Sequence, residues 1–117
     1  SFSILFHLKI DEGWHINSNE PGRESLVPTT ITLKSNSTAI EMLVHYPQGE
    51  TITLSSGSEP ISVYEDSVQI DTSVSISPDA PEKTAILEFE IESQACDDQR
   101  CLPPEKYTLC LAVEISG

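Results

Sequence analysis

Apolar residues alternate with polar ones in five long stretches of this sequence. In the first stretch every second position is apolar, at Phe2, Ile4, Phe6, Leu8 and Ile10. A period of two places all of these side chains on one face of a β-strand, whereas a helix needs apolar residues three and four apart, and no window offers that spacing convincingly. The alternation recurs at residues 40–46, 68–76, 85–91 and 107–115. The chain is therefore predicted to be all-β.

Shorter segments and turns complete the predicted architecture. Further β-favouring runs lie at residues 29–33 and 51–54, and turn-forming clusters separate the strands at residues 17–22, 34–38, 47–50, 55–60 and 77–83. Seven or eight short strands with this punctuation, over about a hundred residues, are typical of an immunoglobulin-like antiparallel β-sandwich. A small barrel is the alternative. Glu88, Glu90 and Glu92 alternate with apolar residues of their strand, so the outer face of that sheet must meet water.

Length and charge limit the function classes. The 117 residues suffice for one hydrophobic core, so we expect a single domain over residues 1–117. Acidic residues outnumber basic ones by 19 to 6, and a surface of this charge repels nucleic acid and anionic lipid headgroups. Neither nucleic acid nor direct lipid binding is expected. With no apolar run near the roughly 18 residues of a membrane span and no signal peptide, the chain looks like a domain excised from a larger protein.

Two cysteines, Cys96 and Cys101, are separated by four residues in the segment QACDDQRCLPPE at residues 94–105. They lie in or beside the connection between the last two long strands, where a turn that folds back would bring their Cα atoms within disulfide reach. Closing so small a ring stabilises a fold by only about 2 kcal/mol. Redox exchange is therefore a better explanation for the pair than stapling, although a plain structural disulfide remains open.

The residues around the cysteine pair bear on its reactivity. Asp97 and Asp98 disfavour a thiolate at the first cysteine, whereas Arg100 favours one at the second. Pro103 and Pro104 fix the backbone after the second cysteine and withhold two donors from strand pairing. We expect a rigid, accessible dithiol with sluggish free thiols.

Other chemistry has weaker support in the sequence. His7, His15 and His45 lie on three separate segments and there is no second cysteine pair, so no metal and no cofactor are predicted. A metal-handling domain that uses the same cysteines is a third alternative. Cys110 is out of phase with the apolar residues of the last strand and is expected to be half-buried in a packing role.

The segment at residues 94–105 resembles the signature C-x(4–5)-C-[LY]-P-P of the N-terminal periplasmic domain of the bacterial thiol:disulfide interchange protein DsbD and of related disulfide-corrector domains. Weaker landmarks of that family look to be present in the same order, and together they cover nearly the whole chain: Gly13 to Asn17, Pro21-Gly22, Pro28-Thr29, Tyr46-Pro47 and Val63 to Asp66. The gap of four residues between the cysteines fits the corrector-like branch.

The resemblance implies an immunoglobulin-like periplasmic domain of an inner-membrane protein, joined to a membrane-embedded domain of the same protein. Cys96 and Cys101 would cycle between dithiol and disulfide and pass electrons to thioredoxin-like periplasmic oxidoreductases, including those of cytochrome c biogenesis. This would be one step of a protein-disulfide reductase activity. The order of the two cysteines does not tell which of them attacks first.

We expect Trp14, His15 and Tyr64 to help line this site. The best-studied members of the family cover their cysteines with a cap loop that bears aromatic residues, but residues 54–60 contain none. Either Leu54 or Ile61 would then supply an apolar lid, or the cysteines would be left more open. The rival hypothesis is an immunoglobulin-like binding or spacer module of a secreted protein, with a structural disulfide between the same two cysteines.

Overall fold

The computed structural model describes residues 2–34, 40–53, 59–77 and 84–114. No helix long and apolar enough to cross a membrane occurs in these ranges. The described residues form the strands β1 (Phe2–Lys9), β2 (His15–Asn17), β3 (Thr30–Lys34), β4 (Ile40–His45), β5 (Glu50–Ile52), β6 (Ile61–Glu65), β7 (Ser67–Ile76), β8 (Thr84–Ser93), β9 (Ala95–Cys96) and β10 (Glu105–Glu114).

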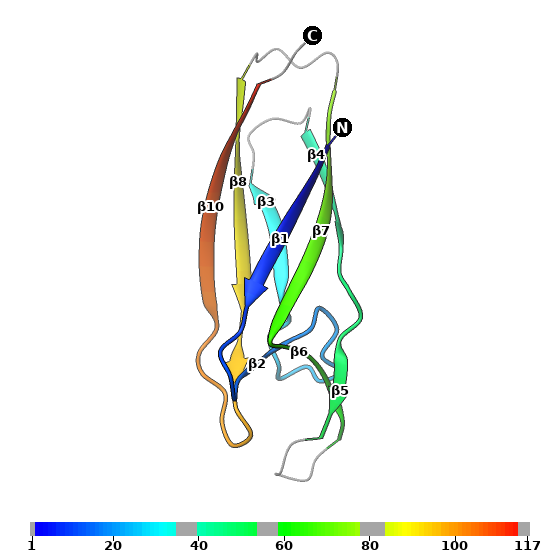
Figure 1. The fold of residues 1–117 in the computed structure, drawn as a ribbon, viewed down its shortest axis with the longest axis vertical. Coiled ribbons are helices and arrows are strands. Elements are labelled where there is room, and N and C mark those ends of the chain that lie inside the picture. Colours follow the sequence, from blue (N-terminus) through cyan, green and yellow to red (C-terminus); the bar gives the residue numbers. More distant parts are fainter. Residues whose placement is uncertain (1, 35–39, 54–58, 78–83, 115–117) are drawn as a thin grey trace.

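Two three-stranded antiparallel sheets face each other along an elongated molecule of 56 × 23 × 20 Å (Figure 1). One has the strand order β1-β7-β4 and the other β10-β8-β3. Phe6 of β1 and Phe89 of β8 meet edge to face across the sheets, with ring centroids 5.2 Å apart. Aromatic pairs favour this geometry, and their burial contributes to the core between the sheets. The structure confirms the predicted all-β, immunoglobulin-like sandwich.

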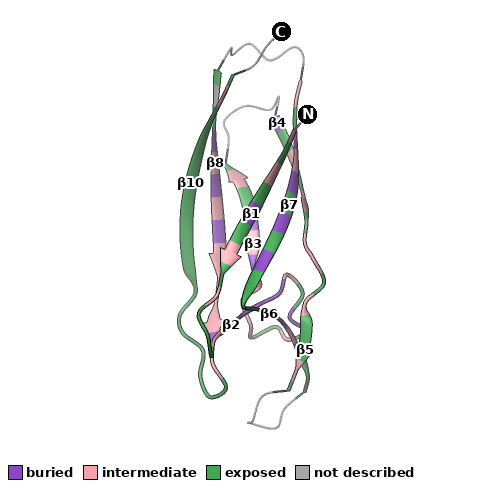
Figure 2. Ribbon diagram, in the orientation of Figure 1, coloured by how far each residue is buried: buried purple, intermediate pink, exposed green. Residues whose placement is uncertain are grey.

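Strands β7 and β8 alternate between buried and more exposed residues, as the period of two predicts (Figure 2). On β8, Leu87, Phe89 and Ile91 are at most 3% exposed. Glu90 lies on the other face, where its carboxylate pairs with Lys34 Nζ at 2.7 Å. The expectation that the glutamate face of this strand meets water is confirmed.

A smaller sheet with the order β5-β6-β2-β9 closes one end of the sandwich, the lower end in Figure 1. Two of its strands extend long strands, because β6 precedes β7 directly and β9 follows β8 directly. Asp66, with a φ of 62°, makes the bend between β6 and β7, and its carbonyl accepts a hydrogen bond from the Ile10 N–H at 2.8 Å. The end sheet is thus continuous with the core.

Strand β10 departs from the prediction for the last segment. Tyr107, Leu109 and Leu111 point to the same side as the core residues of β8 that they pair with, yet they are 53%, 50% and 40% exposed. The reason is that β10 and β1 are edge strands of the two opposing sheets, and a cleft between them leaves side chains of β10 such as Tyr107 and Leu109 open to water. Cys110 is an exposed free thiol, so the expectation that it is half-buried in a packing role was wrong.

Candidate redox site

Cys96 and Cys101 are joined by a disulfide, with the two Sγ atoms 2.06 Å apart and the two Cα atoms 4.0 Å apart. The bond lies at the end of the molecule that carries the small sheet, in the connection from β8 through β9 to β10 (Figure 1). The sequence placed the pair beside the connection between the last two long strands, and the structure confirms that position.

Backbone pairing explains why the sulfur atoms meet. The Asp97 N–H donates to the Arg100 carbonyl and the Leu102 N–H donates to the Ala95 carbonyl, each at 2.8 Å. These bonds flank the two cysteines, which therefore form a non-hydrogen-bonded antiparallel pair, the arrangement in which opposite side chains approach most closely. The segment is a narrow hairpin whose two arms the disulfide links.

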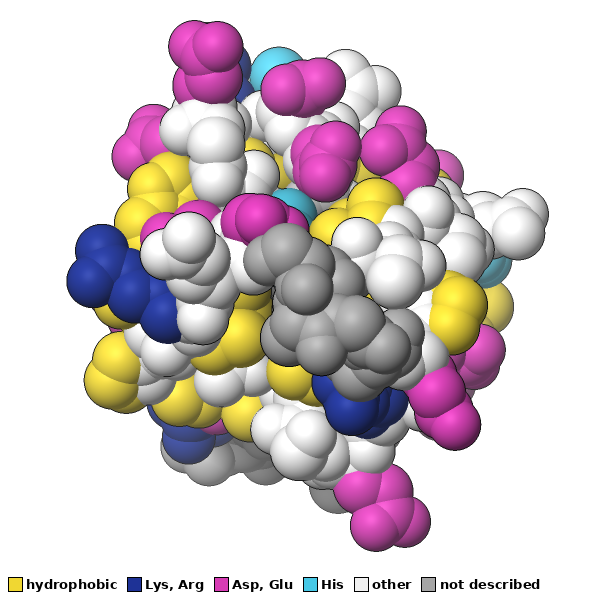
Figure 3. Space-filling model, turned by 90° about the horizontal axis from the view of Figure 1, so that it is seen from below, with side chains coloured by type: hydrophobic (Ala, Val, Ile, Leu, Met, Phe, Trp, Pro, Cys, Tyr) yellow, Lys and Arg dark blue, Asp and Glu magenta, His cyan; other side chains and the backbone are white. Residues whose placement is uncertain are grey.

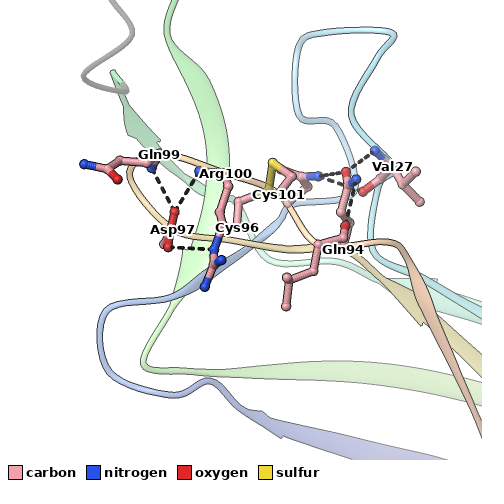
Figure 4. The surroundings of a disulfide bond; sticks show 9 residues. Val27, Gln94, Cys96, Asp97, Gln99, Arg100 and Cys101 are labelled. Atoms are coloured by element: carbon pink, nitrogen blue, oxygen red, sulfur yellow. Dashed lines mark hydrogen bonds and ion pairs between the residues drawn. A yellow bond between two sulfur atoms is a disulfide. The ribbon is translucent and has the colours of Figure 1, made fainter.

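Asp97 shapes the tip of this hairpin. Its Oδ1 accepts hydrogen bonds from the backbone N–H groups of Gln99 at 2.8 Å and Arg100 at 2.7 Å (Figure 4). These two bonds hold the pKa of the Asp97 carboxyl below its usual value, because they favour the charged form. An aspartate in this position makes a tight turn without a glycine.

The two cysteines differ sharply in exposure, which the sequence did not predict. Cys96 is 1% exposed, since β9 pairs with β2 in the small sheet, whereas Cys101 is exposed. The expectation of an accessible dithiol therefore holds for Cys101 alone. Another molecule that reaches this end of the fold can therefore contact Cys101 but not Cys96.

His15 lies directly across from Cys96 in the register of β2 and β9, and on the other side of β2 it pairs with Glu65. The imidazole is buried, and its Nε2 has no hydrogen-bond partner among the described residues. Burial lowers the pKa of His15, opposed by the negative charges of Glu65, Asp97 and Asp98. The structure therefore places His15 next to Cys96, on the neighbouring strand.

Trp14 reaches the hairpin through Arg100, whose guanidinium carbon lies 5.8 Å from the centre of the indole ring. Arg100 Nε also lies 3.5 Å from Asp97 Oδ2. A turn closed by a hydrogen bond from the Trp14 N–H to the Asp11 carbonyl, at 3.0 Å, positions the indole, and Gly13 within it has a φ of 84° that favours glycine. The structure thus places Trp14 against Arg100 of the hairpin.

Tyr64 is placed elsewhere. It pairs with Ile16, which also pairs with Ala95, so these residues share the sheet face opposite to that of His15 and Cys96. The hydroxyl oxygen lies 3.1 Å from Asn19 Oδ1 and 2.9 Å from the Pro47 carbonyl oxygen, so its single proton is shared between these two acceptors, and burial raises the pKa of Tyr64. Tyr64 supports the core of this end of the fold and does not line the disulfide.

Of the two predicted lid residues, only Ile61 lies in the part of the chain that the structure describes, and it does not lie beside the cysteines. Leu54 lies outside the described residues, as does most of the segment that corresponds to the family's cap loop. Ile61 is buried in β6, and β2 separates that strand from β9.

The surface around the hairpin combines acidic and apolar patches, which Figure 3 shows from this end. A cavity of about 250 Å³ is lined by Trp14 and His15 together with the acidic residues Glu65, Asp66 and Asp98. A larger cleft of about 640 Å³ runs between β1 and β10 and is lined mainly by apolar residues, among them Leu8, Ile10, Leu102 and Leu109. Among the described residues, no group of three or more His, Cys, Asp and Glu side chains is arranged to hold a metal ion.

Sequence reasoning gave no role to Gln94, although it lies two residues before Cys96. Its amide hydrogen-bonds to three separate parts of the chain around the hairpin (Figure 4). A polar residue beside a turn motif was the available signal, but its partners are far away in sequence.

Comparison with solved structures finds the same fold in the crystal structure of the N-terminal periplasmic domain of ScsB from Proteus mirabilis, with a TM-score of 0.67 and 20% sequence identity. The match covers 93% of this chain and 39% of that one, so this chain spans less than half of the solved domain. Comparison with curated protein sequences finds no match. The model of the family described as "Thiol:disulfide interchange protein DsbD, N-terminal" matches residues 1–112. By this match the chain belongs to the family of DsbD N-terminal domains.

Proposed function

We propose that this chain passes reducing equivalents, through Cys96 and Cys101, to thioredoxin-like oxidoreductases of the periplasm, including those that serve cytochrome c biogenesis. The observation that carries the proposal is a disulfide with one buried and one exposed cysteine, which links the two arms of a hairpin at one end of the fold. Membership of a thiol:disulfide interchange family supports it. A membrane-embedded domain of the same protein would supply the electrons.

The exposure of the two cysteines suggests the order of steps. A donor thiolate attacks Sγ of Cys101, the bond between the two cysteines breaks, and its electron pair leaves on Sγ of Cys96. A second donor thiolate resolves the mixed disulfide, so that two electrons and two protons have entered the domain. In the onward step the Cys101 thiolate attacks the disulfide of the acceptor, and Cys96 then attacks the mixed disulfide and releases the reduced acceptor.

A redox titration tests the proposal. The oxidised chain, with Cys110 replaced by serine to remove the exposed free thiol, is equilibrated with glutathione and dithiothreitol buffers, and its thiols are alkylated and counted by mass spectrometry. We expect a reversible two-electron couple with a reduction potential above about −300 mV, because structural disulfides tend to have potentials below that value. A bond that stays oxidised in every buffer would instead identify a structural disulfide in a binding or spacer module.

Transfer to a partner needs its own measurement. The reduced Cys110→Ser chain is mixed with an oxidised thioredoxin-fold protein that carries a Cys-x-x-Cys site, and the thiols of both proteins are followed by alkylation. Appearance of the partner's dithiol at the expense of the domain's dithiol is expected. If the domain is redox-active with glutathione but exchanges no faster with this probe than an unfolded dithiol peptide, transfer to thioredoxin-like partners is wrong.

A further inference from the structure

The side chain of Gln94 bridges both arms of the redox hairpin. Gln94 lies on the arm that leads into Cys96, and its Nε2 donates a hydrogen bond of 3.3 Å to the carbonyl of Leu102, the residue after Cys101. On its other side, Gln94 Oε1 accepts hydrogen bonds from the Val27 N–H at 3.0 Å and from Asn17 Nδ2 at 3.1 Å (Figure 4). One amide therefore connects the two arms to a third segment.

The third segment, which contains Val27 and Thr29, is held in place by hydrogen bonds to Asn17 and Ser18. Asn17 is 0% exposed, and its Nδ2 also donates to the Val27 carbonyl at 2.9 Å. The buried Thr29 hydroxyl donates to the Asn17 carbonyl at 2.6 Å, and the Thr29 N–H donates to the Ser18 carbonyl at 3.2 Å. The segment that Gln94 contacts is thus tied to β2 at both ends, and β2 in turn pairs with β9.

The bridge can affect the redox equilibrium only if it contributes differently to the disulfide form and to the dithiol form. In the oxidised domain the sulfur–sulfur bond itself holds the arms together, so the Gln94 hydrogen bonds form at little entropic cost. In the dithiol the arms must stay together through the backbone bonds that flank the cysteines and through Gln94. Because two linked equilibria affect each other equally, a contact that is more stable in the closed hairpin favours the disulfide by the same factor. The Gln94 bridge would in this way raise the effective concentration of one thiol near the other.

We propose that Gln94 is a positioning residue of the redox site, which keeps Cys96 and Cys101 in register in the dithiol and so shifts the equilibrium toward the disulfide. The inference rests on the proposed function, since it needs a pair that opens and closes. Gln94 takes no part in the exchange chemistry, because its amide contacts the Leu102 carbonyl, Val27 and Asn17.

Two substitutions separate the halves of the bridge. Gln94→Ala removes all three contacts. Gln94→Glu keeps oxygen acceptors for Val27 and Asn17 but has no donor for the Leu102 carbonyl, so it breaks the link between the arms alone. Gln99→Ala is the matched control, because Gln99 lies in the same hairpin, is exposed, and contributes its backbone N–H to the turn. All variants carry Cys110→Ser.

The readout is the equilibrium constant for oxidation by glutathione, together with urea unfolding of the oxidised and reduced forms. We expect the constant to fall about three- to tenfold in both Gln94 variants, where tenfold corresponds to about 30 mV for a two-electron couple, and to stay within twofold in Gln99→Ala. The Gln94 changes should also destabilise the oxidised form more than the reduced form. If Gln94→Ala does not fold, Gln94→Glu carries the test.

Two failures remain distinguishable. If the parent protein titrates reversibly but both Gln94 variants have its equilibrium constant, and both redox forms lose equal stability, Gln94 is a structural residue and the inference is wrong. If the disulfide of the parent protein never opens in the buffers, the proposed function itself fails.

Discussion

His15 of β2 and Cys96 of β9 occupy opposite positions in neighbouring antiparallel strands, and both side chains are buried. Opposite residues on one face of an antiparallel pair have their Cβ atoms about 4.5–5.5 Å apart, so any charge on either side chain acts on the other. The carboxylates that reach His15 come from Glu65 on β6 and from Asp97 and Asp98 on the hairpin. The ionisation of this histidine therefore has consequences for the stability of the whole site.

Replacement of His15 by glutamine should reduce the loss of stability in mild acid. The pKa of His15 is lowered by burial from its ordinary value of 6.5, so as pH falls through that value the unfolded chain takes up the proton first and the folded state is disfavoured. The slope from this one group is at most about 1.4 kcal/mol for each pH unit. Urea unfolding of the oxidised protein between pH 7.5 and 5.5 measures it.

The matched variant for this experiment is His7→Gln, because His7 is exposed on β1. It should keep the pH dependence of the parent protein. Equal slopes in the parent and in His15→Gln would contradict the assignment.

Cys101 should be the cysteine that reacts with other molecules. In a Cys110→Ser background, the Cys96→Ser variant leaves the exposed Cys101 thiol and the Cys101→Ser variant leaves the buried Cys96 thiol. We expect the first variant to react with the disulfide reagent dithionitrobenzoate about tenfold faster or more, since thiol exchange requires access to the sulfur. Stopped-flow absorbance at constant pH gives both rates, and the reverse order would refute the proposed sequence of attack.

Asp97 should keep the hairpin tip closed through its oxygen more than through its charge. Asp97→Ala removes the acceptor of the Gln99 and Arg100 N–H groups, and amide hydrogen exchange at these two positions should quicken several-fold. Asp97→Asn keeps an acceptor and should change exchange much less. Because the pKa of Asp97 is lowered, the contribution of its charged form is present above its ordinary value of 3.8 and is lost as pH falls through the lowered pKa. Equal exchange in both variants would assign the effect to charge.

Leu87 and Leu111 offer a test of the fold with one residue type. They are opposite each other on β8 and β10, yet Leu87 is 0% exposed and Leu111 is 40% exposed. Leu87→Ala should cost about 2–5 kcal/mol because it leaves a cavity between the sheets. Leu111→Ala should cost less than about 1.5 kcal/mol, since much of its side chain is already in water. Denaturant unfolding of the oxidised variants measures both, and similar losses would mean that β10 is covered in solution.

The long strands were predictable because each of them has one face on the core. Strand β7, for example, alternates between buried and exposed residues over much of its length, and the predicted segment at residues 68–76 lies within it. The short strands were not predictable in this way. All three residues of β2 are buried, so His15, Ile16 and Asn17 show no alternation, and β9 has only two residues.

The location of the candidate site could be predicted from the sequence, whereas the different burial of its two cysteines could not. The cysteine motif and its prolines pointed to a hairpin, and Trp14 and His15 do lie beside it. The burial of Cys96, however, depends on the pairing of β9 with β2, which lies about eighty residues away in the chain. The local sequence around Cys96 does not reveal that partner strand. Tyr64 was misplaced for a related reason, because a shift of one residue along β6 moves a side chain to the opposite face.

The negative net charge of this chain also affects whether strand β10 can pair with another copy of the chain. Among the described strands it pairs with β8 on one side alone, and its apolar face is half in water, so it could align with the same strand of another copy. At neutral pH the formal net charge of −13 repels such copies from each other. Near the isoelectric point of about 4.3 that repulsion disappears. The excess of carboxylates therefore opposes association through the unpaired edge of β10, and acidification removes this repulsion.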